Sequence, residues 1–139
     1  MTVKMMSIQV STRGNADVMD ITDLVAKTVM ESGINDGMVI IFTPSSTSGL
    51  TTIEFESGCL SDLRRLFDEI IDPERQYAHN ARWGDGNGHS HIRAALIGAS
   101  FSVPFVNRRL TLGTWQQIIF IDFDNRSRRR DLVIQIHGE

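Results

Sequence analysis

The alternation of hydrophobic and polar residues predicts a chain built largely from β-strands. Residues 6–12, MSIQVST, alternate strictly, as a strand with one buried face does. Residues 115–123, WQQIIFIDF, are instead apolar on both faces, so we expect both faces to be covered, and a second subunit could supply one cover. The other predicted strands are residues 37–43, 50–55, 100–105 and 131–138.

Apolar residues at helical spacing predict two main helices, over residues 21–33 and 59–71. Gly33 would end the first helix, and Pro73 stops the second. IRAALIG, residues 92–98, is typical of a short third helix closed by its glycine. Together with about six strands, these helices indicate an α+β fold on a mostly antiparallel sheet.

Length and composition fit one soluble domain, residues 1–139. Hydrophobic residues make up 41% and charged residues 22%, as in ordinary globular proteins. The net charge of −3 gives no general attraction to nucleic acid or membrane, and no apolar run approaches the roughly 20 residues of a membrane span. Cys59 is the only cysteine and the N-terminus lacks a signal-peptide pattern, so we expect a cytoplasmic protein without an intrachain disulfide.

The segment 74–90 has no hydrophobic period, and a loop this long is uncommon in a compact domain unless it has a function. It contains His79 and leads into GDGNGHSHIRA, residues 84–94, which holds His89 and His91. One interpretation is a polar loop of accidental composition. Three of the four histidines fall on this stretch, so we favour a binding or catalytic site.

Imidazole is the commonest metal-binding side chain and the usual acid–base group at neutral pH. Histidines at i and i+2 could grip one ion in extended backbone, but on a helix they diverge by about 200°. The glycines before His89 favour irregular backbone, with a helix starting near Ser90 and free N–H groups there that favour an anion such as phosphate. Asn87 adds a further oxygen. The candidate metal ligands suit zinc or a similar divalent ion and are His79, His89, His91 and Asp85.

Other polar segments give weaker indications. RSRRR, residues 126–130, could bind phosphate, but in an acidic protein we interpret it as a solvated turn, from which one arginine could reach an anion across a subunit boundary. SSTSG, residues 45–49, lacks the strand–serine–helix elbow of hydrolases, so its hydroxyls suit turns or supporting hydrogen bonds. Cys59 has no basic neighbour to activate it, and His137 should face solvent or a neighbouring subunit.

Several motifs together resemble one family over nearly the whole chain. They are PSSTSGLTTIE (44–54), YAHN (77–80), GDGNGHSHIRAALIGAS (84–100), LTLGTWQQIIFIDFD (110–124) and RSRRRDLVIQIHGE (126–139). On these motifs the chain is similar to the YjbQ family, for which LGTWQ and the HxHIRAALIG block are the most specific. The resemblance implies a sandwich-like α+β subunit in a homotrimer, with histidine-containing clefts near the subunit boundaries.

The resemblance also implies roles for individual residues. His79, His91 and Glu54 would hold or orient a divalent metal, zinc or magnesium. Thr47 and Asn87 match further positions of the same motifs and are candidate catalytic residues. The candidate substrate and anion contacts are Ser46, Arg93, Trp115, Gln116 and Arg128.

One position departs from the family pattern. Many members have a histidine in an HTT motif where this chain has Ser45. His89, which many members lack, could replace that histidine.

Some members of the family have secondary thiamine-phosphate synthase activity, which joins a pyrimidine diphosphate to a thiazole phosphate and releases pyrophosphate. The resemblance therefore implies a metal-dependent transferase with a phosphorylated small-molecule substrate. One alternative is another metal-dependent enzyme, such as a phosphate-ester or small-molecule hydrolase. The other is a non-catalytic trimer that binds a metabolite.

Overall fold

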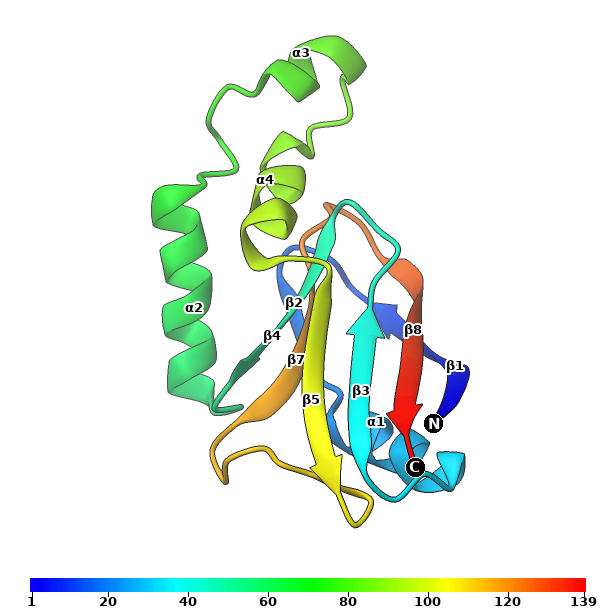
Figure 1. Ribbon diagram of the computed structural model, residues 1–139. Coiled ribbons are helices and arrows are strands. Elements are labelled where there is room, and N and C mark those ends of the chain that lie inside the picture. The colour runs from blue at the N-terminus through cyan, green and yellow to red at the C-terminus, as the bar shows by residue number, and fades with distance from the viewer.

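Two antiparallel sheets and four helices make up the fold, and the computed structural model describes all residues, Met1–Glu139 (Figure 1). The strands are β1 Thr2–Thr12, β2 Asp17–Asp20, β3 Gly37–Phe42, β4 Ser48–Ile53, β5 Ser100–Val106, β6 Arg109–Leu110, β7 Gln117–Asp122 and β8 Arg128–Gly138. The helices are α1 Thr22–Ser32, α2 Ser57–Ile70, α3 Ala78–Trp83 and α4 Gly88–Ile97. One sheet has the strand order β1-β8-β3-β5-β6 and the other β2-β7-β4, which confirms the predicted α+β class.

The strand β7 lies in the middle of the molecule because its side chains alternate between two cores. Ile118 and Phe120 join the core between the two sheets. Ile119 points the other way and packs with Phe67 of α2 and Ala94 of α4. The layers therefore run from the five-stranded sheet through the three-stranded sheet to these helices.

Both faces of residues 118–123 are covered, as predicted, whereas Trp115 and Gln116 at the start of the predicted strand are exposed; the chain itself supplies both covers. Ile118, Ile119, Phe120 and Ile121 are fully buried within the single chain. A second subunit is therefore the wrong explanation for this pattern. The apolar faces of α2 and α4 provide the cover for which a second subunit was one possible source.

Three short elements were not predicted from the sequence. The strands β2 and β6 have 4 and 2 residues, too few to show a period. The helix α3 has 6 residues and lies inside the segment 74–90, which we expected to be irregular. The third helix also begins earlier than expected, at Gly88, so that α4 includes both His89 and His91.

The strand β8 begins at Arg128, earlier than the predicted start at residue 131. The interpretation of RSRRR as a solvated turn is therefore wrong for its last three arginines, which pair with β1. Strand alternation turns Arg128 and Arg130 inward, where the buried carboxylates Asp122 and Asp124 pair with them. Because of these ion pairs, charged residues can form the start of β8. The hydrophobic pattern could not predict this part of the strand.

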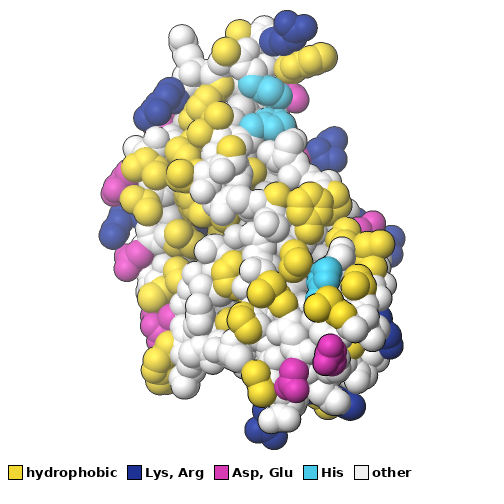
Figure 2. Space-filling view, viewed as in Figure 1, with side chains coloured by type: hydrophobic (Ala, Val, Ile, Leu, Met, Phe, Trp, Pro, Cys, Tyr) yellow, Lys and Arg dark blue, Asp and Glu magenta, His cyan; other side chains and the backbone are white.

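The outer face of the five-stranded sheet carries no helix, and hydrophobic side chains gather on it (Figures 1 and 2). Its strands expose large apolar side chains, which are Val3, Met5, Met38, Phe42 and Val106. His137 lies opposite Met38 on the neighbouring strand and contacts Gln135, at 2.9 Å between their Nε2 atoms. None of the helices is long and apolar enough to cross a membrane.

Candidate functional site

A polar cavity of about 470 Å³ lies where α3 and α4 meet the ends of the two sheets. Its lining comes from the hydroxyl-rich loop 45–47, the segment 79–91 and the start of β8. Two histidine side chains lie side by side on the surface at the level of α3 and α4 (Figure 2). The structure thus gathers residues that are far apart in the sequence into one polar site.

His79 and His91 form a close pair in this cavity. Their ring centroids are 4.4 Å apart and the rings are tilted by 40°. Nδ1 of His79 lies 3.3 Å from Oδ1 of Asp85 but makes no hydrogen bond of good geometry. Two imidazoles and a carboxylate therefore face one another across the turn that joins α3 to α4.

Glycines make this tight turn possible. Gly84 ends α3 in the left-handed region, with φ of 71°, and Gly86 follows with φ of 69°. At Gly88 a Cβ would lie 2.5 Å from Cβ of Tyr77, so only glycine lets α4 begin there. The N–H of Gly88 donates to Oδ1 of Asn80 at 2.8 Å, which ties α4 to α3 but leaves that N–H unavailable to an anion.

Paired acids and arginines form and support the floor of the cavity: Asp124, Arg128 and Arg130 line it, and Asp122 lies beneath it. Arg128 Nη2 lies 2.7 Å from Oδ2 of Asp124. Arg130 donates to both carboxylate oxygens of Asp122, from Nε at 2.8 Å and from Nη2 at 3.0 Å. Both carboxylates are buried, at 0% and 1% exposure, so their charges are stable only because these partners are present.

Asp124 accepts hydrogen bonds from several directions. Burial alone would raise its pKa, but the backbone N–H of Asn125, the side-chain amide of Asn87 and the guanidinium of Arg128 outweigh burial and lower the pKa below its ordinary value. The Nδ2 group of Asn87 donates to Oδ1 at 3.2 Å. The side chain of Asp124 is therefore an ionised carboxylate at neutral pH.

The hydroxyl-rich loop closes another side of the cavity. Oγ1 of Thr47 accepts from Nη2 of Arg130 at 2.8 Å, which fixes the loop on β8. Oγ of Ser45 accepts the N–H of Thr47 at 3.1 Å. Ser46 is exposed at the rim, where its hydroxyl could meet a ligand.

His89 does not join the other histidines. Because α4 already begins at Gly88, the His-Ser-His residues are helical, and the two imidazoles diverge. His89 is buried beside Tyr77, with ring centroids 6.3 Å apart, and is not part of the cavity lining. Burial, with a smaller contribution from Arg93, lowers its pKa, so the ring is neutral in the fold. Its location does not support a replacement for the family histidine absent at Ser45.

Arg93 also lies outside the cavity. Its Nε and Nη2 atoms donate to the carbonyl of Ile71, at 3.2 and 2.8 Å, and Nη2 contacts Asp68 at 3.1 Å. The side chain is buried and joins α4 to the end of α2. This arginine therefore supports the fold and is not free to bind a phosphate.

Glu54 is at the opposite end of β4 from Thr47, a distance of roughly 20 Å along a six-residue strand. It lines a different hollow with Trp115, while Gln116 lies on the adjoining surface. The ligand atoms of Glu54, Glu56 and Cys59 lie within 4.8 Å of one another there. A single chain thus does not bring Glu54, Trp115 or Gln116 to the histidines.

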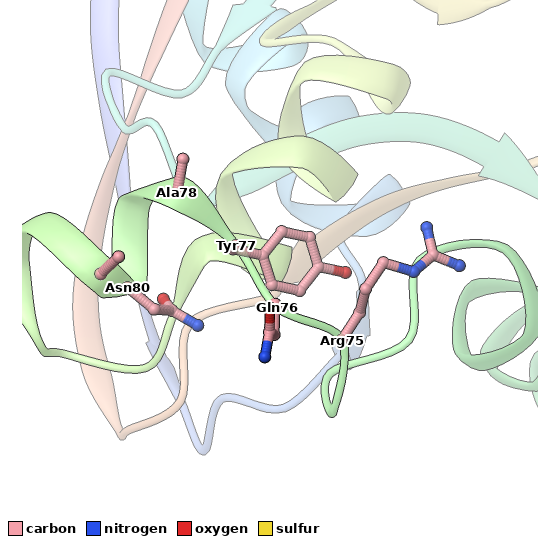
Figure 3. A pocket seen from close by; sticks show the side chains of 6 residues that line it. Arg75, Gln76, Tyr77, Ala78 and Asn80 are labelled. Atoms are coloured by element: carbon pink, nitrogen blue, oxygen red, sulfur yellow. The ribbon is translucent and has the colours of Figure 1, made fainter.

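A larger cavity of about 760 Å³ lies beside residues 75–81 (Figure 3). Its lining includes Arg75 and Tyr77, but no histidine or carboxylate. The hydroxyl of Tyr77 donates to the carbonyl of Asp72 at 2.7 Å, and Asn80 accepts from Gly88. Because these polar groups serve the fold, we regard the histidine cavity as the candidate site.

The donor set of the histidine cavity fits a divalent cation. Two buried atoms on its lining have no hydrogen-bond partner, Nδ1 of His79 and Oδ1 of Asn87. Imidazole nitrogens with carboxylate and amide oxygens suit zinc or a similar ion. The ligand atoms of His79, His91 and Asp85 do not all lie within 4.8 Å of one another. At least one of these partly exposed side chains must therefore rotate before all three can bind one ion.

Sequence reasoning missed the floor of the cavity. Asp122 lies at the end of the predicted strand 115–123 and Asp124 just beyond it, and the hydrophobic pattern gives no sign that both are buried and pair with arginines. The spacing carried a signal, because two acids and two arginines, each pair at i and i+2, flank the same short turn. Charges repeated with the period of a strand point to the same side and can pair.

The fold and the cavity can be compared with known proteins. The family model described as "UPF0047 protein YjbQ-like" matches residues 6–139. The chain belongs to the YjbQ/UPF0047 family. Curated members similar to it include a UPF0047 protein of Methanothermobacter thermautotrophicus, 36% identical over 94% of this chain and 90% of that protein. Another is YugU of Bacillus subtilis, 34% identical over 95% of this chain and 98% of that protein.

Solved structures of the family have the same fold. A protein of unknown function from Sulfolobus solfataricus, described as YbjQ-like, superimposes with a TM-score of 0.93 at 34% identity, over 99% of both chains. An uncharacterised YjbQ/UPF0047 protein from Clostridium acetobutylicum gives a TM-score of 0.87 at 34% identity, over 95% of this chain and 99% of the other. The resemblance inferred from the motifs is thus confirmed for the family and its fold.

Proposed function

We propose that this chain is a metal-dependent enzyme of the thiamine-phosphate synthase type, which joins a pyrimidine diphosphate to a thiazole phosphate. The reaction breaks the bond that holds the diphosphate, forms a bond to the thiazole and releases pyrophosphate. The observation that carries the proposal is the single cavity of about 470 Å³ that combines potential metal ligands with hydroxyl and guanidinium donors.

His79, His91 and Asp85 would hold the divalent ion, zinc or magnesium, in this cavity. Bound there, the ion would withdraw charge from the departing diphosphate. The side chains of Ser46 and Arg128 would contact phosphate oxygens, since both line the same cavity. Nε and Nη2 of Arg128 face Asp124, which leaves Nη1 for a ligand.

The experiment is to mix the two substrates with purified protein and zinc or magnesium, and to measure thiamine phosphate and pyrophosphate together. The wild type should form both products in equal amounts. His91→Ala should lower the rate by about 100-fold or more, since even outer partners of metal ligands cost 10- to 100-fold. His89→Gln, whose ring is buried outside the cavity lining, is the matched histidine control and should keep the wild-type rate.

Pyrophosphate release without thiamine phosphate would replace the transferase with a hydrolase. Binding of both substrates without turnover would replace it with a metabolite-binding protein. Either outcome rejects the proposed reaction while leaving the cavity as the binding site.

We also propose that the protein is a homotrimer, as the family resemblance implies. The support is the outer face of the five-stranded sheet, where Val3, Met5 and Phe42 are 56%, 72% and 42% exposed. Large exposed apolar areas usually mark interaction surfaces. Light scattering at micromolar concentration should give three times the chain mass, and Met5→Lys should lower that mass. A stable monomer of the wild type would reject the trimer.

A further inference from the structure

Asn87 is the residue just before α4, and its side chain combines burial with an unused acceptor. The residue is 8% exposed and lines the histidine cavity. Nδ2 donates to Asp124 at 3.2 Å, whereas Oδ1 has no partner. A buried carbonyl oxygen without a partner is costly, so the fold keeps it at the expense of stability.

The orientation of this amide is fixed by its neighbour. Asp124 accepts from the guanidinium of Arg128, at 2.9 Å from Nε, and from the N–H of Asn125 at 2.8 Å. A carboxylate paired in this way can only accept hydrogen bonds, so the amide must turn its NH₂ group toward it. Oδ1 is then the atom left without a partner.

The surroundings of Oδ1 favour a cation over an organic donor. His79 and Asp85 line the same cavity, and Nδ1 of His79 also lacks a partner. Amide carbonyl oxygens are common ligands of divalent ions, usually beside carboxylates. An unpartnered oxygen and an unpartnered imidazole nitrogen in one cavity can be satisfied together by a single ion.

We infer that Oδ1 of Asn87 is a direct ligand of the divalent ion, and that Asp124 is the positioning residue that holds this oxygen toward the ion. The inference rests on the proposed function for the presence of the ion. It identifies which atom of the amide side chain is the ligand and gives a role to a buried carboxylate of the cavity lining. Residues that orient metal ligands usually contribute 10- to 100-fold to metal affinity.

The test is titration of metal-free protein with Zn²⁺ alone, at neutral pH. Asp124→Asn removes the charge but keeps the shape, and lets the Asn87 amide turn over. It should weaken zinc binding by about tenfold or more. Asp131→Asn is the matched control, because Asp131 is exposed on β8, away from the cavity lining, and accepts from Gln9. It should leave zinc binding unchanged.

The double variant Asn87→Asp/Asp124→Asn separates positioning from simple support of the fold. It transposes the amide and the carboxylate, so the net charge is kept and an acceptor again faces the cavity. Zinc affinity should return to within about threefold of the wild type, although Arg128 has still lost its ion pair. Failure of the double variant to recover affinity, in a protein with wild-type circular dichroism, would overturn the inference.

If Asp124→Asn does not fold, Co²⁺ spectra of the wild type and Asn87→Ala give the answer. Loss of an oxygen ligand changes the ligand field, so the visible absorption bands should shift and change intensity. Identical spectra would overturn the inference. If the wild type binds zinc and needs His91 for it, but Asp124→Asn binds zinc with the same affinity, this inference alone is rejected. If the wild type binds no zinc, the metal of the proposed function is rejected as well.

Discussion

Two polar clusters lie at opposite ends of β4, and only one of them has the properties of a site. Glu54, Glu56 and Cys59 have ligand atoms within 4.8 Å of one another, closer than those of the histidine cavity. Yet Glu56 caps α2 by accepting from the N–H groups of Gly58 and Cys59, and both glutamates are exposed. Their hydrogen-bonding capacity is used by the helix and by water.

The histidine cavity shows the opposite combination. Its ligand atoms are less tightly gathered, but buried ion pairs fix their supports, and two atoms lack partners, on His79 and Asn87. Close spacing of acids is common on surfaces, whereas buried atoms without partners are rare and point to something that satisfies them. Burial and fixed orientation are therefore better guides to a site here than distance alone.

The largest effect should come from breaking the buried floor of the cavity. Asp122→Asn removes the buried charge that Arg130 faces at 2.8 Å and leaves this arginine only the more distant Asp124, at 3.7 Å, which should cost about 3 kcal/mol of unfolding free energy. Urea denaturation followed by circular dichroism measures this change in the free energy of unfolding. The exposed Asp131→Asn serves as control. Equal stabilities of the two variants would mean that the floor is not what distinguishes the cavity.

A smaller effect concerns His89, which is buried behind the cavity. Its pKa is lowered from the ordinary value of 6.5 by burial and by Arg93, so the unfolded chain takes up the proton first as the pH falls. Stability should therefore decline below the ordinary histidine pKa. His89→Gln should remove this decline, which for one proton is at most about 1.4 kcal/mol per pH unit.

The comparison uses the urea midpoints of the wild type and His89→Gln. They are measured between pH 7.5 and 5, in steps of roughly half a pH unit around the ordinary histidine pKa. The difference between the two midpoints should be constant at the upper end and should shift in favour of His89→Gln toward the lower end. Parallel curves throughout would show that folding does not lower the pKa of His89.

The smallest effect should be found at the exposed cluster. Cys59 is half-buried, and the carboxylates of Glu56 and Glu54 raise the pKa of its thiol, so it is a poor nucleophile. Cys59→Ser should change the unfolding free energy by less than about 0.5 kcal/mol and leave activity unchanged. A large loss of activity with an intact fold would transfer functional importance to this end of β4.

The sequence predicted the main strands and helices because their apolar periods are long enough to read. It predicted that β7 is covered on both faces, but only the packing of α2 and α4 shows that one chain is sufficient. It missed α3, whose 6 residues make less than two helical turns, and the charged start of β8. Short or charged elements depend on tertiary partners that a local pattern does not contain.

The candidate site was predicted in part. The composition of residues 79–91 indicated the cavity, and the structure brings His79, His91, Asp85 and Asn87 together there. His89 was misplaced because the start of α4 depends on how the backbone of Gly88 packs against the side chain of Tyr77, a tertiary contact that spacing does not reveal. Asp124 was missed because burial, not residue type, gives it a role.

The most direct test of the account is the zinc content of the purified wild type and three histidine variants after dialysis against zinc. Elemental analysis should find one ion per chain in the wild type and in His89→Gln, and almost none in His79→Ala and His91→Ala. This pattern follows from the pairing of His79 with His91 and the separate burial of His89. A metal-free wild type, or a loss in His89→Gln equal to that in His91→Ala with the fold intact, would contradict the account.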